Sequence, residues 1–400
     1  MVAATTVGAV NDMTARWARD AVGERGTVLT AVGVWPLLAL LAGPAGGPAR
    51  AELAGALGID AADAVRAGRD LLGALDSADG VDAALGLWTR RALSLRPEWP
   101  ASLPLDAHGE LTGDTTADQE ALNAWAKRHT DGLIDRMPVE VDADTLLVLA
   151  SALLVRTTWV RPFDEHPHEV PEGPWAGREL TLLRRYGGTA PEQVRVHRTP
   201  AGPLTSVEVE GDNGLDVHLL LGPPEMPGGE VVGHGVAALC GGYPTVCGAA
   251  LTDGAGPGLQ VATVPSWDGV PVVSLSCARF TVEADHDLLR RAGLFGLGAA
   301  SDTSRGHFPG ISQVPLAVTS ARQKATATFG PKGFRAAAVT AVAVGMGSAP
   351  STPPHTAQWV SARFDRPFGF LAVHRATGMV LVAGWVTEPD AAEPRTGYPW

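Results

Sequence analysis

The sequence predicts a single α+β domain with a substantial apolar core. Three observations lead to this prediction. The first third of the chain carries apolar residues at helical spacing, a nearly continuous apolar run follows at residues 145–159, and the remainder alternates short strand-like segments with glycine and proline. This order suits an α+β domain better than a doubly wound sheet. We expect residues 1–389 to form the domain and residues 390–400 to form a loose tail.

The first helices are predicted in ARWARDAV, WPLLALLA and ARAELAGAL, where apolar residues recur at helical spacing. The segment around the second of them, residues 27–46, is apolar enough to suggest a membrane span. Because Pro36 and the GPAGGP ending interrupt a straight span, a buried core helix is the better interpretation.

A further helix is predicted in DQEALNAWAKRHT. Thr116 followed by Gln119 has the spacing of a capping box, and Gly132 then ends the helix. Leu122 and Trp125 share the face that we expect to be buried.

Most strands are predicted in the second half of the chain. The run TLLVLASALLVRTTW indicates a strand buried on both faces, and the alternating segments between residues 162 and 269 fit antiparallel strands. ADHDLLRRAGL is predicted to be helical because its acids precede its arginines and Gly293 follows. ARQKATATF is another strand candidate, and FGFLAVHRATGMVLVAGWV indicates two strands joined at HRATG.

Charge and cysteine content narrow the functional class. The net charge is −12 and the charge runs are short, which argues against binding to nucleic acid or to a membrane surface. Cys240, Cys247 and Cys277 make a poor disulfide framework, so we expect reduced thiols, with a Cys240–Cys247 bridge as the alternative. The N-terminus shows no secretory pattern, which predicts a cytoplasmic location, with an extracellular one as the alternative.

The sequence offers no convincing enzyme motif. GMGSAP does not place its serine in the G-x-S-x-G elbow, and GLFGLGAAS follows a helix, whereas a dinucleotide loop follows a strand. In DEHPHEVPE, His166 and His168 lie beside glutamates and could bind a metal, but the prolines favour a surface loop. We therefore expect no catalytic residue, no metal site and no cofactor.

The C-terminal segment FDRPFGFLAVHRATGMVLVAGWVTEP, residues 364–389, resembles the closing signature of the serpin family. The matching positions are Asp365, Arg366, Pro367, Phe368, Thr377, Gly378, Gly384 and Pro389. Gly369 departs from the pattern, since the family usually has a large apolar residue there.

Other blocks resemble the family in order and spacing, so the resemblance covers about residues 12–389. LNAWAKRHTDGLI resembles the family's Asn-x-Trp helix, and LVLASALLVRTTWVRPFDE resembles the next central strand, with Ser151 in place of an asparagine. ARFTVEADHDLLRRAGL and GHFPGIS resemble the segment that leads to the reactive loop.

The resemblance implies a serpin fold with a large central sheet, two smaller sheets and an exposed reactive-centre loop at about residues 331–363. In serpins a protease cleaves this loop, the hinge before the cut inserts into the main sheet as a new strand, and the protease is trapped. The native fold is metastable, and the chain would be a monomeric suicide inhibitor of a serine protease, not an enzyme.

The implied hinge begins at Gly333 and is made mostly of small residues, which tolerate both solvent and the sheet interior. It comprises Gly333, Phe334, Ala336, Ala337, Ala338, Val339 and Thr340. Counted from Gly333, the residues facing inward after insertion would be Phe334, Ala336, Ala338, Thr340, Val342 and Val344. Those facing outward would be Arg335, Ala337, Val339, Ala341 and Ala343.

The family's spacing implies a bait bond at Gly347–Ser348, with Met346–Gly347 as the alternative. Either bond suits a protease with a small or medium apolar pocket, such as an elastase-like or subtilisin-like serine protease, or alternatively a cysteine protease. A trypsin-like target is not expected, because no basic residue lies between Thr340 and Pro354.

Several hinge residues depart from the inhibitory pattern. Pro331 stands where an acid usually ends the preceding strand, and it cannot donate a ladder hydrogen bond. Phe334 fills a position that favours a small residue, and Arg335 replaces an acid. A non-inhibitory serpin-fold binding protein, or a loop cleaved as a plain substrate, is therefore the alternative function.

The region where the sheet opens also departs from the family. Thr30 keeps one hydroxyl, but Gly33 stands where a second serine is usual, and Gln323 stands where a histidine is frequent.

Overall fold

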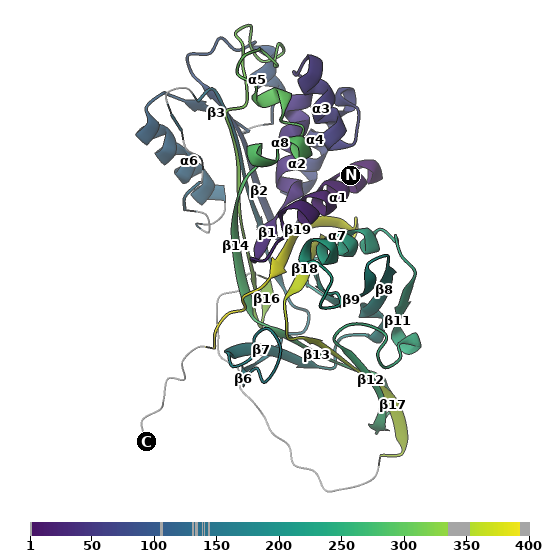
Figure 1. The fold of residues 1–400 in the computed structure, drawn as a ribbon. Coiled ribbons are helices and arrows are strands. Elements are labelled where there is room, and N and C mark those ends of the chain that lie inside the picture. Colours follow the sequence, from purple (N-terminus) through teal and green to yellow (C-terminus); the bar gives the residue numbers. More distant parts are fainter. Residues whose placement is uncertain are drawn as a thin grey trace, which may run out of the picture.

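The structure is a computed structural model that describes residues 2–104, 107–129, 132, 135–137, 139, 141–142, 145–334 and 353–392, with only the backbone of Ala84 and Ala152 (Figure 1). This part of the chain forms three sheets, and most of its helices gather around one end of the first sheet (Figure 1). The α+β class predicted from the sequence is confirmed.

The central sheet runs along the molecule and carries the hinge. Its strands follow the order β3 (His108–Leu111), β2 (Val81–Arg90), β4 (Leu147–Val155), β15 (Ser320–Phe329), β16 (Gly333–Phe334) and β5 (Thr157–Thr158), while β14 (Phe280–Asp287) pairs with the other edge of β15.

Two further sheets complete the fold: the second lies to the right of the lower part of the central sheet in Figure 1, and the third lies at the bottom. The second sheet has the order β1 (Thr27–Leu29), β19 (Met379–Val386), β18 (Phe368–His374), β10 (Leu215–Leu221), β9 (Gly202–Val209), β8 (Val194–Thr199) and β11 (Thr245–Cys247). The third sheet has the order β12 (Leu259–Ser266), β17 (His355–Phe364), β13 (Val272–Ala278), β7 (Glu179–Tyr186) and β6 (Asp164–Glu169).

The helices cover the upper part of the central sheet and one face of the second sheet (Figure 1). They are α1 (Ala4–Ala21), α2 (Ala31–Ala42), α3 (Gly47–Leu57), α4 (Ala61–Asp76), α5 (Glu98–Ser102), α6 (Thr115–His129), α7 (Gly228–Leu239) and α8 (Ala292–Phe295). Short 3-10 turns occur at Pro191–Gln193, Gly248–Ala250, Leu289–Arg291 and Ala299–Ser301.

Several elements confirm the sequence predictions. Helix α2 is buried along its whole length and contains Pro36, as expected of a core helix. Among the described residues, no helix combines the length and apolarity needed to cross a membrane. Leu122 and Trp125 are buried on α6, β4 falls within the predicted apolar strand, and β18 and β19 form the predicted hairpin.

The predicted helix at residues 284–294 is wrong in its first half. Strand β14 continues to Asp287, paired with β15 as far as Arg322. His286 is buried and its ring bonds the carbonyl oxygen of Val28, so strand pairing and packing outweigh the helix-like order of charges. The helical residues are limited to a 3-10 turn and α8, which ends at Gly296 in the left-handed conformation.

Two local predictions also need correction. Helix α6 is capped by Asp114, whose Oδ1 accepts from the N–H groups of Thr116 and Ala117, and not by Thr116. The segment DEHPHE is the edge strand β6, paired with β7, and not a loop.

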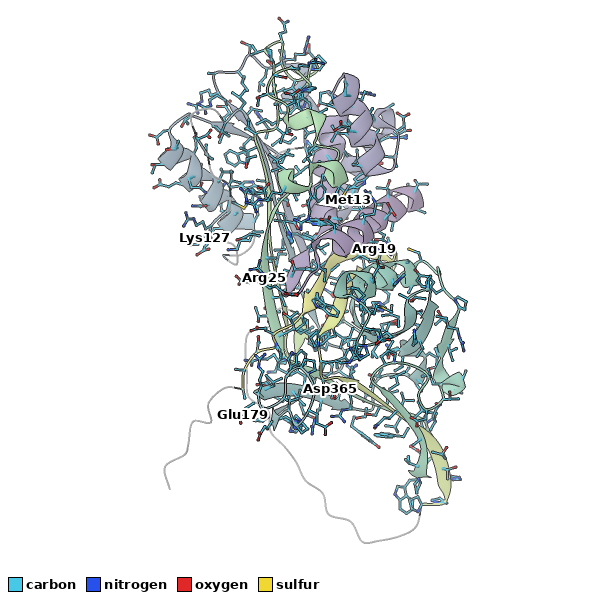
Figure 2. The ribbon with its side chains drawn as sticks, in the orientation of Figure 1. Met13, Arg19, Arg25, Lys127, Glu179 and Asp365 are labelled. Carbon is cyan, nitrogen blue, oxygen red and sulfur yellow. The ribbon has the colours of Figure 1, made fainter. Side chains whose placement is uncertain are left out.

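The start of the predicted tail is attached to the body. Asp390 accepts hydrogen bonds from Arg279 Nε (3.2 Å) and from the N–H of Thr281 (2.9 Å). Ala392 donates its N–H to the carbonyl oxygen of Glu179, which lies at the lower end of the molecule in Figure 2. Residues 393–400 of the predicted tail lie outside the described residues.

Candidate functional site

The hinge enters the central sheet through a tight turn after β15. The N–H of Gly330 bonds the carbonyl oxygen of Gly333 (3.0 Å), so Pro331 and Lys332 are the two turn residues. Their carbonyl oxygens accept hydrogen bonds from Phe163 N–H (2.8 Å) and Trp159 N–H (2.9 Å) respectively. Pro331 therefore lies in a turn, where the missing N–H removes no ladder hydrogen bond. The expectation that this proline weakens the strand ladder is wrong.

Strand β16 lies between β15 and β5 and runs antiparallel to both. Phe334 pairs with Phe329 on one side and with Thr157 on the other, while Gly333 pairs with Thr158. Gly333 has to be a glycine, because a Cβ there would collide with the carbonyl oxygen of Thr157. The first two hinge residues are thus already a strand of the central sheet.

Phe334 is accommodated in an aromatic cluster. It is 2% exposed, and its ring centroid lies 6.1 Å from that of Phe370. Nearby, the ring of Phe329 lies 4.8 Å from Trp159 and 5.5 Å from Phe280. Phe334 faces inward, as the alternation counted from Gly333 predicts. Its ring was expected to overpack the sheet interior, but it is already buried in this structure.

Beyond β16, the two central strands leave an unpaired stretch that we call the slot. Parallel strands β4 and β15 pair only where Ser320–Gln323 lie beside Val148–Ser151. The slot is bounded by residues 152–155 and 324–328, and the described strands show no backbone pairing across it. Thr326 Oγ1, on this stretch, is buried and has no hydrogen-bond partner among the described residues. Two parallel strands with free ladder positions can accept one antiparallel strand between them.

A polar group closes the far end of the slot, and we call it the glutamine cluster: Thr30, Gly33, Ser151 and Gln323. Gln323 is fully buried, accepts from the N–H of Thr30 (3.0 Å) and donates to the carbonyl oxygen of Thr30 (2.9 Å). Its Nε2 also lies 3.3 Å from Ser151 Oγ. Thr30 Oγ1 is buried without a hydrogen-bond partner in the described structure. Three residues that depart from the family pattern, Gly33, Ser151 and Gln323, therefore lie together around Thr30.

The signature residues connect the third sheet to the second. Asp365 lies near the junction of these sheets (Figure 2) and 3.6 Å from Arg363. Arg366 Nη2 donates to the carbonyl oxygen of Gly222 (2.5 Å), and burial lowers its pKa. Phe368 is fully buried and begins β18. These residues hold the end of β17, the strand that follows the loop.

Most predicted loop residues lie outside the described residues. They include Arg335, Ala336, Ala337, Ala338, Val339, Thr340, Met346, Gly347 and Ser348. The structure describes the ends of the loop, which are Phe334 in β16 and residues from Pro353 onward, with β17 beginning at His355.

The three thiols are free, so the Cys240–Cys247 bridge is not formed. Cys277 is buried in β13, and burial raises its pKa to about 12. A thiol of this kind is a packing group with little nucleophilic character.

The sequence analysis did not predict the hydrogen bonds that hold the turn between β15 and β16. Trp159 and Phe163 belong to the block LVLASALLVRTTWVRPFDE, which resembles the family's central strand, and no further role was expected of them. In the structure they bond the turn backbone, and Trp159 Nε1 also donates to the carbonyl oxygen of Gly330 (2.9 Å). An indole in an otherwise apolar run was the available signal, because buried indole N–H groups need an acceptor.

Comparison with known proteins connects this geometry to a family. A family model described as Serpin (serine protease inhibitor) matches residues 11–171 and 263–389. Glia-derived nexin of Mus musculus is 27% identical over 288 residues, 69% of this chain and 64% of the nexin, so the match spans less than two thirds of that relative. Putative serpin-Z6A of Oryza sativa subsp. japonica is 26% identical over 382 residues, 92% of this chain and 89% of the relative.

Solved structures show the same architecture. Tengpin, a thermophilic serpin in its native state, has a TM-score of 0.73 at 14% identity, covering 96% of this chain and 94% of tengpin. Thyroxine-binding globulin in complex with thyroxine has a TM-score of 0.70 at 16% identity, covering 96% of this chain and 98% of the globulin. At such identities the likeness establishes the fold alone.

Proposed function

The chain belongs to the serpin family, and we propose on that basis that it traps a serine protease by loop cleavage and strand insertion. The observation that carries the proposal is the start of the hinge. Strand β16 already runs antiparallel between β15 and β5, and the unpaired slot lies directly ahead of it. An inserting strand would therefore continue the hydrogen-bond ladder that β16 already forms with β15 and β5.

The register of β16 supports the proposal further. In an antiparallel pair each step forward along the hinge is one step back along β15, so the Phe334–Phe329 pair aligns Ala336 with Ala327 and Ala338 with Ala325. Ala325 and Ala327 are buried and face the core. The inserted alanines would therefore lie beside alanines on the β15 side, whereas the same register sets them beside Val155 and Leu153 on the β4 side.

In the same register, the one polar residue among the inward-facing hinge residues would reach the glutamine cluster. Thr340 aligns with Gln323 on β15 and, through the Phe334–Thr157 pair, with Ser151 on β4. Both belong to the glutamine cluster, where the hydroxyl of Thr30 has no partner. A threonine hydroxyl arriving there would find donors and acceptors, whereas an apolar residue would leave them unpaired.

The driving force would be strand burial. A new central strand forms ladder bonds on both sides and buries a few hundred Å² of apolar surface, which contributes on the order of 10 kcal/mol. A strand of about 14 residues at roughly 3.3 Å each could carry a tethered protease across much of the molecule. Trapping requires that insertion outpace hydrolysis of the acyl-enzyme.

The target is proposed from the bait bond. Cleavage at Gly347–Ser348, or alternatively Met346–Gly347, fits an elastase-like or subtilisin-like protease with a small apolar pocket, or a cysteine protease of similar preference. Location in the cytoplasm, with the extracellular alternative, and the monomeric state stay predictions.

Incubation with elastase or subtilisin, followed by a denaturing gel, tests the function. We expect an SDS-stable adduct of inhibitor and protease, with release of the C-terminal fragment that begins near Ser348. Clean cleavage near that bond without an adduct would replace the inhibitor proposal with the plain-substrate alternative.

A non-inhibitory serpin remains the second candidate, and Arg335 is the observation that favours it. A basic residue in place of the usual acid could slow the step that follows Phe334. Pro331 no longer supports this candidate, because the turn uses it without loss.

A further inference from the structure

The chain between α7 and β13 adds one strand to each of two sheets. Strand β11 lies at the edge of the second sheet beside β8, and β12 lies at the edge of the third sheet beside β17. Residues 172–262, which include β11 and the first half of β12, lie outside the residues that the family model matches. The inhibitory mechanism uses neither strand, so β12 needs an explanation of its own.

Strand β17 is enclosed between two strands that are consecutive in the chain. All eight residues of β12 pair antiparallel with residues 355–362, and β13 pairs in parallel with residues 359–364 on the other edge (Figure 1). The turn between β12 and β13, residues 267–271, therefore crosses the first half of β17. A Cβ at Gly269 would lie 3.6 Å from His355 Cβ, so the turn passes close to this strand. We call β12 and this turn the clasp.

The clasp is fixed at both of its ends. At its start, the N–H of Arg363 bonds the carbonyl oxygen of Gly258 (2.9 Å), and the side chain of Leu259 is buried. In its turn, Ser266 Oγ donates to Asp268 Oδ1 (2.9 Å). The clasp is therefore an ordered part of the third sheet.

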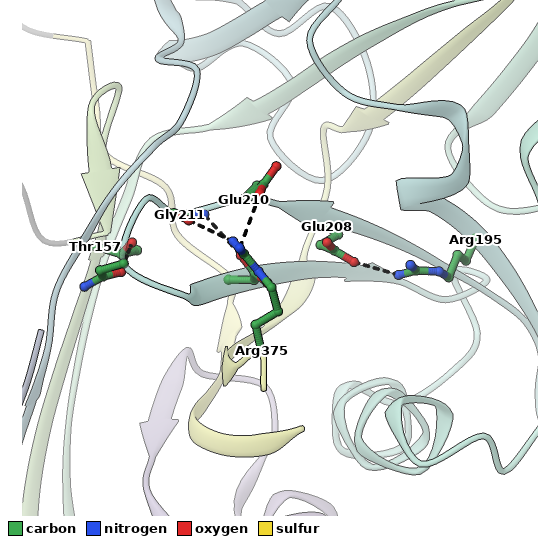
Figure 3. Close-up of polar contacts among 8 residues, drawn as sticks. Thr157, Arg195, Glu208, Glu210, Gly211 and Arg375 are labelled. Atoms are coloured by element: carbon green, nitrogen blue, oxygen red, sulfur yellow. Dashed lines mark hydrogen bonds and ion pairs between the residues drawn. The ribbon is translucent and has the colours of Figure 1, made fainter. Parts of the chain in front are cut away.

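The chain before the clasp is attached to the second sheet. Cys247 of β11 pairs with Arg195 of β8, and Arg195 Nη1 bonds Glu208 Oε2 of β9 at 2.9 Å (Figure 3). Between β11 and β12, the carbonyl oxygen of Leu251 accepts from Gln358 Nε2 of β17 (3.0 Å). The clasp therefore connects β17 to the second sheet as well as to the third.

The length of the loop shows what β17 would have to do if the loop inserted without being cut. Insertion of about 14 residues would carry residue 347 roughly 45 Å along the central sheet. Seven residues, 348–354, connect it to β17, and fully extended they span at most about 25 Å. At least about six further residues, 355–360, would have to leave the third sheet. All of them pair with β12. Cutting the loop removes this requirement.

We propose that the clasp holds β17 in the third sheet and thereby makes insertion depend on cutting of the loop; this rests on the insertion proposed above. Residues 355–358 pair with β12 and not with β13, so without β12 they would have no strand partner in the described part of the chain. The rest of β17 would then be an edge strand, which can leave a sheet by breaking one ladder, whereas β17 is now held by two.

The alternation along β12 supplies a matched pair of variants. The N–H of Val261 bonds Asp253 Oδ1 (3.1 Å) and Pro265 has no N–H, so the odd-numbered residues of β12 direct their backbone away from β17. Ala262→Pro therefore removes an N–H that faces β17, whereas Thr263→Pro removes one that faces the open edge. Both positions are exposed, so the two variants differ mainly in this hydrogen bond.

Hydrogen–deuterium exchange of the full, uncut chain measures the hold on β17. We expect Ala262→Pro to speed exchange of residues 355–362 by at least about 10-fold and Thr263→Pro by less than about 3-fold. Leu259→Ala, which removes the one buried side chain of β12, is a second variant and should act as Ala262→Pro does. Melting curves check that each variant folds. Equal exchange in all folded forms would show that β12 does not hold β17.

Incubation of each uncut protein at about 10 °C below its melting temperature tests the consequence. The readout is the fraction that is full length on a denaturing gel and has acquired the melting temperature of the nicked form. We expect Ala262→Pro to convert at least about 10-fold faster than the wild type, and Thr263→Pro to stay within about 3-fold of it.

Two results would separate the proposals. Faster exchange of β17 without faster conversion would limit β12 to covering a sheet edge and would overturn the clasp, while insertion after cutting still stands. A nicked wild type that gains no stability would instead overturn the proposed insertion itself.

Discussion

At the scale of single residues, Gln323 joins the two halves of the central sheet. Its side chain bonds both backbone groups of Thr30 on one side and approaches Ser151 of β4 on the other. Because it is fully buried, removing either partner would leave a desolvated amide, at a cost of about 1–3 kcal/mol. The glutamine cluster therefore controls how readily β4 and β15 separate.

Gly33→Ser should stabilise the native state by about 1–2 kcal/mol. A Cβ at residue 33 would lie 3.5 Å from Gln323 Nε2 and 3.6 Å from Ser151 Oγ, ordinary contact distances, so the new hydroxyl reaches the cluster. Gly8→Ser, at an exposed position of α1 with open space around it, is the control and should gain only about 0.5 kcal/mol from helix propensity. Urea unfolding measures both, and equal gains would show that the cluster makes no contact with the new hydroxyl.

Acid should destabilise the protein through His197. Burial, followed by the nearby Arg195 and His218, lowers the pKa of His197 from 6.5 to about 4. Between these two values the imidazole is protonated in the unfolded chain and neutral in the folded chain. The stability is complete above pH 6.5 and is lost as the pH falls toward 4, by about 1–2 kcal/mol after solvent screening is allowed for. Unfolding curves between pH 4.5 and 7 measure this loss, which His197→Gln should reduce. An unchanged pH slope in that variant would contradict the assignment.

Individual residues also mark where sequence reasoning stops. Gly33, Ser151 and Gln323 are each visible in the sequence as departures from a family pattern, and Thr30 is visible as the hydroxyl that keeps it. Their mutual contact is not, because they come from three places in the chain and only the packing of β1 and α2 against β15 and β4 brings them together. Helix α7 was missed for a similar reason: the alternation in LDVHLLL is visible in the sequence, but the helix that packs on this strand is not.

At the scale of elements, the turn from β15 to β16 is the part of the hinge that the structure describes. Its carbonyl oxygens are held by Trp159 and Phe163, so the turn is fixed before any loop is cut. An insertion of the loop would therefore start in a defined register.

Pro331→Ala should destabilise the protein by about 0.4–1 kcal/mol, because proline limits the unfolded chain and loses no hydrogen bond in this turn. Lys332→Ala, at the exposed neighbouring turn position, should change stability by less than about 0.5 kcal/mol. Chemical denaturation compares them. A gain in stability for Pro331→Ala would mean that the ring does interrupt a ladder.

Strands were predicted more accurately than the helix at residues 284–294. The apolar run of β4 and the hairpin of β18 and β19 carry their own periodicity, so the sequence is sufficient for them. The segment after Phe280 has a helix-like order of charges, and its strand form depends on eight paired positions along β15. Long-range pairing of that kind has no local signal.

At the scale of the whole molecule, the inhibitory proposal predicts a gain in stability on cleavage. In the wild type, nicking near Gly347 should raise the melting temperature by roughly 10–20 °C, as the loop becomes a strand. Differential scanning calorimetry of intact and nicked samples measures the change.

A matched pair of variants tests the direction of the hinge side chains. Ala338→Arg would bury a charge beside Ala325, so both the thermal gain and the protease adduct should be largely lost. Ala337→Arg points outward and should retain both. Equal behaviour of the two variants would exclude insertion in the register of β16.

The brief ladder between β4 and β15 has a consequence for handling the protein. Among the described residues, four pairs and one buried amide close the seam between β4 and β15 that, on the inhibitory proposal, would admit the chain's own loop, and a loop from a neighbouring molecule would meet the same seam. The rate at which the protein inhibits a protease and its tendency to polymerise on warm storage should therefore increase or decrease together. A variant with a more stable contact between β4 and β15 should polymerise more slowly during storage and inhibit its target protease more slowly.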